Sequence, residues 1–245
     1  MGVSAPVERE AARQGRLGAL AAIEGTGTAG READTRERLI KAALRVFADR
    51  GIASATLREI TEEAGANVAA VNYYFRSKEE LTRTVLETCL RPINENRLRS
   101  LESLVAEHGD RPVPLEDLVE ALVRPMVVNS LDDSGGRSPI RLILQVRALP
   151  QPLTNTILAD QFDRIHRAFL AALGPALPGL TRSELALRYD FARGSIMQIL
   201  GDLDPAARDL PDLAIQHAGL DNEDIIRQLV AFIAAGFRAP AFSPR

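Results

Sequence analysis

The chain has 245 residues, 46% of them hydrophobic, a composition typical of a folded protein of one or two domains. It contains no apolar run long enough to cross a bilayer and no recognisable signal peptide, so we expect a cytoplasmic protein with no membrane partner. Its single cysteine, Cys89, excludes an internal disulfide. The net charge of −3 argues against a protein that is basic throughout.

Residues 1–33 are rich in Gly, Ala and charges of both signs, and we interpret them as a flexible N-terminal tail. The tail contains GTGTAG over residues 25–30, which formally matches the G-x-G-x-x-G pattern of dinucleotide sites. That pattern requires a buried strand before it, whereas the preceding LGALAAIE has poor strand character. We therefore predict a linker and no cofactor.

Residues 34–80 contain short helical patterns whose start signals are in place. Each pattern opens on a side chain that can cap a helix, in most cases with a Glu three residues later. These signals are Asp34 with Glu37, Thr56 with Glu59, Asn67, and Ser77 with Glu80. Gly51 and Gly65 can take the left-handed conformation, so they are expected to end the first two helices.

Two short helices joined by a tight turn at Gly65 match the helix-turn-helix motif, whose second helix enters the major groove of DNA. The third helical pattern carries suitable side chains for that role. Ala69 and Ala70 leave one face slim enough for close approach, and Asn72 can donate to and accept from a base edge. The pattern therefore predicts a recognition helix.

Side chains beside this helix can reach the phosphates of DNA. Tyr73 and Tyr74 carry hydroxyls, and Lys78 lies at the next helix start, where backbone N–H groups attract anions. Residues 34–78 contain eight basic and six acidic side chains and so carry +2, whereas the whole chain carries −3. This local charge favours a DNA-facing end on an acidic body.

Residues 34–80 resemble the TetR family of bacterial transcriptional repressors, through TRERLIKAALRVFADRG, TLREITEEAG, the closing YYF of the recognition helix, and SKEEL. The resemblance implies DNA contacts at Thr56, Arg58, Asn67, Val68, Ala69, Ala70, Asn72, Tyr73, Tyr74 and Lys78. Where this chain has Val68 the family often has a basic residue, and where it has Ala69 the family often has Gly. Likewise the family often has Tyr in place of Asn72 and His in place of Tyr74. These departures keep the DNA-binding role and leave the operator sequence open. For Thr56 and Ser77 the alternative role is a helix cap, and for Arg58 it is a solvated charge. For Tyr74 and Phe75 the alternative is packing that fixes the recognition helix.

The remaining segment, residues 81–240, carries further helical patterns, so we predict an all-α chain. A long helix follows Ser77, with a kink or interruption at Pro92, and ends at Gly109; the next helix bends at Pro125. Residues 140–149 are apolar on most sides, which fits a strand or a helix, and the helical neighbours favour a helix. The predicted architecture is a three-helix DNA-binding domain over residues 34–80 and a helical effector-binding and dimerisation domain over residues 81–240.

The two last helical patterns have apolar stripes suited to helix packing. In the first, the steps alternate between four and three, at Leu185, Tyr189, Ala192, Ile196, Ile199 and Leu203. Gly194, Ser195 and Gly201 are small enough for close helix contact. The family resemblance implies that these helices build a four-helix homodimer interface. The alternative is that they only close the core of one subunit.

The resemblance also implies an effector pocket in the body. Its candidate lining is Met126, Ile143, Leu144, Arg147, Phe162, His166, Phe169, Phe191 and Met197, with Gln161 and Arg193 as further polar candidates. For the polar members, a structural role is the alternative interpretation. The stretch NVAAVNYYF is similar to that of TetR-type regulators of fatty-acid metabolism, which suggests a lipid-like or acyl effector.

No motif of catalysis or metal binding occurs in the sequence, which lacks H-E-x-x-H, G-x-S-x-G, a phosphate loop and a Cys/His cluster at metal spacing. We therefore expect no enzyme, no catalytic residues and no metal. The predicted function is a homodimeric repressor that binds a palindromic double-stranded operator and is released when a small effector tilts the long helix. An activator and an effector-independent DNA-binding protein are the alternatives.

Overall fold

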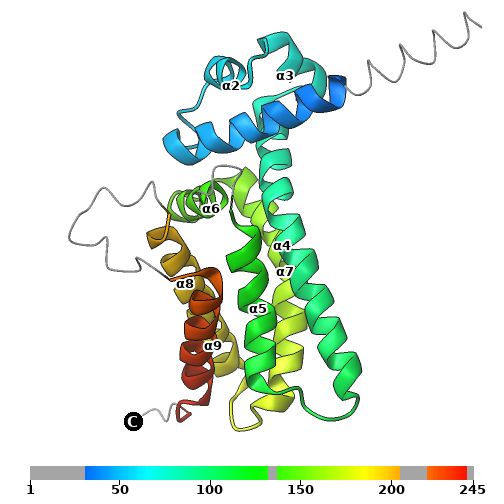
Figure 1. Ribbon diagram of the computed structural model, residues 1–245, viewed down its shortest axis with the longest axis vertical. Helices are drawn as coiled ribbons and strands as arrows, with labels where there is room; N and C mark the ends of the chain where they lie inside the picture. The colour runs from blue at the N-terminus through cyan, green and yellow to red at the C-terminus, as the bar shows by residue number, and fades with distance from the viewer. Residues whose placement is uncertain (1–30, 132–136, 205–219, 242–245) are drawn as a thin grey trace, which may run out of the picture.

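The computed structural model describes residues 31–131, 137–204 and 220–241, and its regular structure within these ranges is entirely helical (Figure 1). A helix over residues 31–50 precedes α2 (Leu57–Ala64), α3 (Val68–Phe75) and α4 (Lys78–His108). The chain continues through α5 (Leu115–Asn129), α6 (Ser138–Ala148), α7 (Pro152–Ala176), α8 (Arg182–Asp202) and α9 (Asn222–Arg238). The predicted all-α fold is confirmed.

The 31–50 helix, α2 and α3 form a small head at one end of the molecule, and α4 leaves it toward the body (Figure 1). Apolar side chains from these helices meet in one buried cluster, with Leu39, Phe47, Ile60 and Val71 at 0% exposure. Burial of such side chains is the main force that holds the three helices together, since helices as short as α2 and α3 are unstable alone.

Local capping signals place most helix starts of the head correctly. The Thr56 hydroxyl accepts from the Glu59 N–H at 3.2 Å, and the Asn67 amide oxygen accepts from the Ala70 N–H at 2.9 Å. The Ser77 hydroxyl accepts from the Glu80 N–H at 3.1 Å in the same way.

The predicted start of the helix before α2 is wrong. Residues 31–33 are already helical, so Asp34 lies inside the helix, and its carboxylate pairs with Arg38 at 3.3 Å instead of capping. The expected tail therefore ends before residue 31. The rest of that tail, including GTGTAG, lies outside the described residues.

The body is a bundle in which α4 runs from the head to the far end (Figure 1). α5 and α7 pack along α4, and α8 and α9 close the other side. Pro92 lies inside α4 without interrupting its 31 residues, so the predicted interruption is not observed. A single continuous helix thus connects the head to the interior of the body.

α6 lies directly beneath the head, and the helical assignment of this apolar segment is confirmed (Figure 1). Leu142 and Val146 of α6 join the buried cluster of the head. On the other side, a Cβ added at Gly201 of α8 would lie 2.7 Å from Cδ1 of Leu144. Gly201 therefore permits close contact between α8 and α6 of one chain.

Candidate DNA-binding and effector sites

One face of α3 is open to solvent and the other is buried. Val68, Ala69, Asn72 and Tyr73 are exposed, Tyr73 at 71%. The residues that anchor the helix, Val71 and Phe75, are at most 1% exposed. α3 is therefore held by its inner side, against which Ala70 is half-buried, while Ala69 and the Asn72 amide face outward, as a recognition helix requires.

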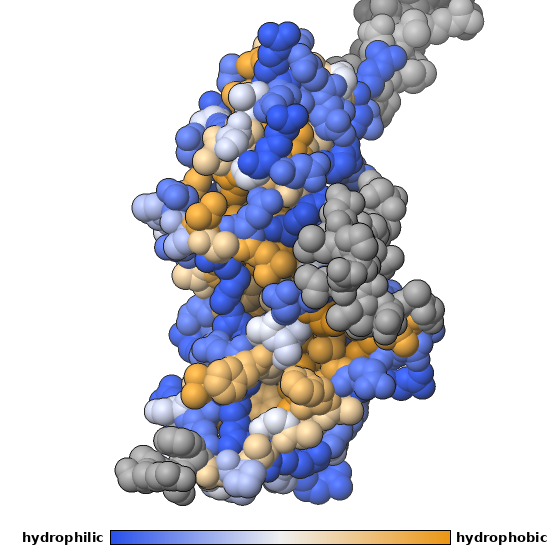
Figure 2. All heavy atoms as spheres, turned by 90° about the vertical axis from the view of Figure 1, so that its left-hand side faces the viewer, coloured by the Kyte–Doolittle hydropathy of each residue, from blue (hydrophilic) through white to orange (hydrophobic). Residues whose placement is uncertain are grey.

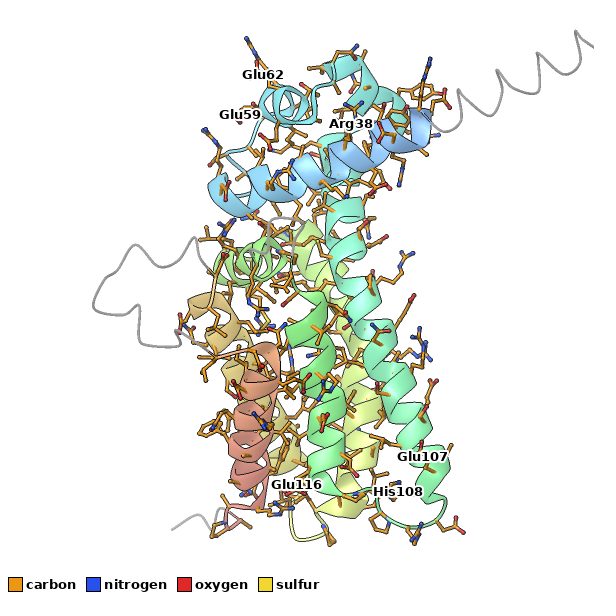
Figure 3. All side chains as sticks on the ribbon, viewed as in Figure 1. Arg38, Glu59, Glu62, Glu107, His108 and Glu116 are labelled. Carbon is orange, nitrogen blue, oxygen red and sulfur yellow. The ribbon has the colours of Figure 1, made fainter. Side chains whose placement is uncertain are left out.

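The turn between α2 and α3 fixes the angle at which α3 is presented. Gly65 has φ 59°, a left-handed conformation that favours glycine. Arg38 lies between the 31–50 helix and α2 (Figure 3), and its Nη1 donates to the Ala64 carbonyl at 3.2 Å. The last carbonyl of α2, which has no donor within its own helix, thus accepts a hydrogen bond from a side chain of the neighbouring helix.

The predicted contact residues of α2 form hydrogen bonds within the head. The Thr56 hydroxyl donates to Oε2 of Glu59 at 2.9 Å, and the hydrogen bond from the Thr56 backbone N–H lowers the pKa of the Glu59 carboxyl. Arg58 is mostly exposed and donates to Glu62 at 2.8 Å. Figure 3 shows Glu59 and Glu62 on α2, at the end of the molecule away from the body. Nε of Arg58 is thus engaged with Glu62, while the rest of its exposed guanidinium can still donate to a phosphate.

Lys78 occupies a different place from the one its sequence position suggests. Its Nζ donates to the carbonyls of Ala53 and Ala55, at 3.3 and 2.5 Å, and the side chain is half-buried. Lys78 therefore ties α4 to the turn before α2. Its ammonium is directed at backbone carbonyls of the head, so its main effect in this structure is to position α2.

The two tyrosines of α3 differ in exposure. Tyr74 is half-buried and packs edge-on against the exposed ring of Tyr73, with ring centroids 4.9 Å apart. Desolvation raises the pKa of Tyr74, so its hydroxyl stays protonated at neutral pH and remains a donor. The Tyr73 and Tyr74 hydroxyls can donate hydrogen bonds of the kind that phosphate oxygens accept.

Two arginines beside α3 were not identified from the sequence. Arg76 directly follows the helix, is exposed, and has φ 62°, the only positive φ of a non-glycine residue in the described ranges. Arg36 of the 31–50 helix places its guanidinium 5.4 Å from the centroid of the Phe75 ring. The position of Arg76 immediately after YYF is a signal that could have revealed it.

The predicted effector-pocket residues divide into an inner and an outer set. Met126, Ile143 and Phe169 are buried, and Leu144, Phe162, His166 and Met197 are half-buried. Arg147 is exposed at the end of α6. Phe191 is 65% exposed on the outer side of α8, so its assignment to an interior pocket is wrong.

Polar side chains inside the body were missed from the sequence. Arg97 and Asn94 of α4 are only 4% and 6% exposed. Arg97 lies near Tyr189, whose ring centroid is 5.1 Å from that of His166 and 5.9 Å from the Arg193 guanidinium carbon. The sequence NENRLRS looks solvent-exposed, and only the packing of α5 and α7 on α4 buries its Asn94 and Arg97.

An apolar groove lies on the outer face of α8 and α9. Figure 2 views this face and shows hydrophobic side chains gathered in its lower half. The groove has a volume of about 530 Å³ and is lined by Phe191, Gly194 and Ser195 of α8 and by Phe232 of α9, among others. Phe232 is 69% exposed. The stripe from Leu185 to Leu203 instead packs largely into the core of its own subunit.

The part of the chain that the structure describes has no helix that could span a membrane. It also has no group of three or more His, Cys, Asp or Glu side chains placed to hold a metal ion.

Two family models match this chain. The model described as bacterial regulatory proteins of the tetR family matches residues 39–85, which include α2 and α3. The model described as the tetracyclin repressor-like C-terminal domain matches residues 120–236. Together the two matches cover more than half of the chain, and they divide it into the same head and body as the structure.

Two curated relatives and one solved structure illustrate the similarity. The regulator SrpR of Pseudomonas putida is 39% identical over 66 residues, 27% of this chain and 31% of the relative. The repressor BepR of Brucella suis is 30% identical over 101 residues, which are 41% of this chain and 46% of the relative. The chain thus spans less than half the length of either relative.

The similar solved structure is AibR, crystallised with isovaleryl coenzyme A and operator DNA. It is 16% identical, has a TM-score of 0.57, and the match covers 81% of this chain and 97% of that one. At this identity the likeness shows the fold alone, and that fold includes both the head and the body.

Proposed function

The chain belongs to the TetR family of bacterial transcriptional regulators, and we propose that it is a repressor that binds a palindromic operator as a homodimer and is released by a small effector. Members of the family are DNA-binding regulators rather than enzymes. The observation that carries the proposal is the exposed face of α3, with Ala69, Asn72 and Tyr73 outward while Val71 and Phe75 anchor it.

In the proposed complex, α3 lies in the major groove. Asn72 forms the hydrogen bonds to a base edge, and Val68 supplies an apolar contact of the kind that fits a thymine methyl group. Tyr73 and Arg76 contact phosphates on either side, because both are exposed and lie at the end of α3. Phosphate contacts position the helix, and base contacts supply the sequence preference.

The homodimer forms through the outer face of α8 and α9. Phe191 and Phe232 are large apolar side chains that a monomer would leave in water. Gly194 and Ser195 line the groove between them, and a Cβ added at Gly194 would meet nothing within 4 Å in the chain, so a second copy has room to approach. A two-fold dimer requires two operator half-sites related by the same symmetry.

The effector binds in the body and acts through α4. The buried and half-buried members of the predicted lining provide an apolar environment that suits an acyl group. AibR, a protein of the same fold that was crystallised with both isovaleryl coenzyme A and operator DNA, supports an acyl effector here. Because α4 is continuous from the head to the far end of the body, a tilt of this helix changes the separation of the two heads.

The experiment that tests the proposal is selection of bound fragments from genomic DNA by the purified full-length chain, followed by footprinting. We expect a protected palindrome whose half-sites are about one helical turn, or a multiple of it, apart. The variant Asn72→Ala should have a weaker preference for that site, whereas Arg99→Ala, on the exposed side of α4, should keep it. Recovery of unrelated fragments with no common palindrome would contradict the proposal.

A further inference from the structure

A charged side chain of α4 is buried without an opposite charge. Arg97 is 4% exposed, and its Nε donates to the Leu122 carbonyl of α5 at 2.8 Å. No carboxylate of the described residues forms an ion pair with it. Burial lowers the pKa of Arg97 to about 10, which still leaves the guanidinium charged at neutral pH. A buried and unpaired charge is unfavourable, so its retention calls for a partner.

A second buried group on the same face of α4 also lacks a partner. Asn94 precedes Arg97 by three residues, which puts the two side chains on one side of the helix. The Asn94 Nδ2 donates to the Gln161 carbonyl of α7 at 2.9 Å, whereas its Oδ1 is buried with no hydrogen-bond partner. The interior thus presents unused donors on Arg97 beside an unused acceptor on Asn94.

The groups that face Arg97 from the neighbouring helices add positive charge. Arg193 of α8 is close enough to lower the pKa of Arg97 further, and its own charge also lowers the pKa of Arg147 of α6. Asp190 pairs with Arg193 at 2.8 Å and is about half exposed, and its charge also acts on Arg147. Arg193 and Arg147 therefore share one partly solvated carboxylate, whose ion pair is with Arg193 and not with the buried Arg97.

Aromatic rings flank this cationic cluster. The Arg193 guanidinium carbon lies 5.6 Å from the centroid of Phe162 and 5.9 Å from that of Tyr189. Burial raises the pKa of Tyr189, so its hydroxyl stays protonated and can donate a hydrogen bond. Arg147 is exposed, Arg193 is partly exposed and Arg97 is buried, so the three positive charges lie at increasing depth from the surface.

We propose that Arg97, Arg193 and Tyr189 bind the anionic oxygen group, a carboxylate or a phosphate, of the effector, whose neighbouring N–H or O–H donates to Asn94. The inference rests on the proposed function, since it specifies the chemistry of the effector of that regulator. The planar guanidinium of Arg97 can donate two parallel hydrogen bonds to two oxygens of a carboxylate or a phosphate. The bound anion also supplies the negative charge that Arg97 lacks as a partner. The apolar remainder of the effector lies against Phe162 and Phe169.

The test is thermal denaturation of the full-length chain with four probes of one chain length: sodium hexanoate, hexyl phosphate, hexanol and hexylammonium chloride. We expect hexanoate, hexyl phosphate or both to raise Tm by roughly 2–4 °C, because a ligand that binds only the folded state stabilises it. Hexanol and hexylammonium should not do so at the same ionic strength. A response to hexanoate alone assigns a carboxylate, and a response to hexyl phosphate alone assigns a phosphate.

Three variants separate a binding role from a structural one. Arg97→Met removes the charge, and Arg97→Gln removes it while keeping a donor for the Leu122 carbonyl; both should abolish the anion-dependent shift. Arg99→Met, two residues away on the exposed side of α4, is the matched control and should keep the shift. If one neutral Arg97 variant does not fold, the other decides. An equal anion shift in a folded Arg97 variant and in the wild type would overturn the proposal.

Operator binding by the same preparations distinguishes this inference from the proposed function. A wild-type chain that binds its operator and shows no preference for anionic probes would overturn the anion site alone. A wild-type chain that binds no specific DNA would overturn the proposed function itself.

Discussion

Arg141 of α6 donates from Nη2 to Oδ1 of Asp49, on the 31–50 helix, at 2.8 Å. The same guanidinium donates from Nη1 to Asp204, just after α8, so one side chain connects the head with two helices of the body. Gln145 of α6 adds a hydrogen bond from Nε2 to the Ala48 carbonyl. Together with the buried Leu142, these contacts make α6 a second connection between head and body, next to α4.

The two ion pairs of Arg141, with Asp204 and with Asp49, should contribute unequally to the free energy of unfolding. Asp204 is 2% exposed, so Arg141→Met takes a positive partner from a buried carboxylate, and we expect a loss of about 2–4 kcal/mol in the free energy of unfolding. Asp49 is 61% exposed as a side chain, so Asp49→Asn should cost less than about 1 kcal/mol. Urea denaturation measures both. Equal losses in the two variants would contradict the difference in burial.

Asn72 should decide base preference at one position of each half-site. Its amide is exposed on α3 and can form two hydrogen bonds with an adenine. Asn72→Ala should therefore reduce discrimination at that base pair by about 1–3 kcal/mol, while affinity for unrelated DNA changes little. Competition binding with operators substituted at each position measures this. Discrimination that stays the same at every position would remove Asn72 from the contacts.

Substitution of Arg76 should change the salt dependence of DNA binding, whereas substitution of Lys78 should change the stability of the head. Arg76 is exposed beside α3, so Arg76→Met should reduce the dependence of log affinity on log salt by about 1, with unchanged stability. Lys78 donates to the Ala53 and Ala55 carbonyls, so Lys78→Met should destabilise the head while its salt dependence stays near that of the wild type. Salt titrations of operator binding, together with melting curves, measure both effects. The reverse pattern would restore Lys78 as the phosphate contact.

The helix starts of the head follow from the sequence because a cap is a local interaction. The side chains of Thr56, Asn67 and Ser77 each accept a hydrogen bond from the backbone N–H three residues later, and this spacing can be recognised in the sequence. Lys78 could not be placed in the same way. Its partners, Ala53 and Ala55, lie 25 and 23 residues away, across two helices.

The interior of the body was harder to predict, because burial there depends on how helices pack. α8 carries large apolar side chains on two sides, and its sequence does not state which side faces inward. The prediction places Phe191 in the lining of the effector pocket, but its ring is exposed, whereas Tyr189 of the predicted packing stripe lies inside and is 2% exposed. Arg97 was missed for the same reason, since an arginine in a polar stretch is usually solvated.

Glu59 should make the stability of the head depend on acid pH. Its carboxyl pKa lies below the ordinary value of 4.5, mainly because the Thr56 N–H and hydroxyl bond to the charged form. The unfolded chain therefore binds the proton more readily. The resulting stabilisation is present above about pH 4.5 and is lost as pH falls through the pKa of the folded state. Glu59→Gln should show a smaller loss of stability between about pH 5.5 and 3.5 than the wild type, by urea denaturation. Glu107→Gln, near the far end of α4 (Figure 3), is a control in which the wild-type dependence should remain.

Phe191 and Phe232 should control the oligomeric state. Both rings are exposed on the outer face of α8 and α9, where burial against a second copy would remove them from water. Phe191→Asp and Phe232→Asp should each weaken the dimer by about 2 kcal/mol or more, which is about 30-fold in dissociation constant, as expected for a central apolar contact. Light scattering over a dilution series measures the constant. Leu149→Asp, at a 74% exposed site after α6, is the control and should remain dimeric. A wild-type chain that is monomeric at micromolar concentration, or aspartate variants with unchanged dimer dissociation, would contradict the assignment of this face.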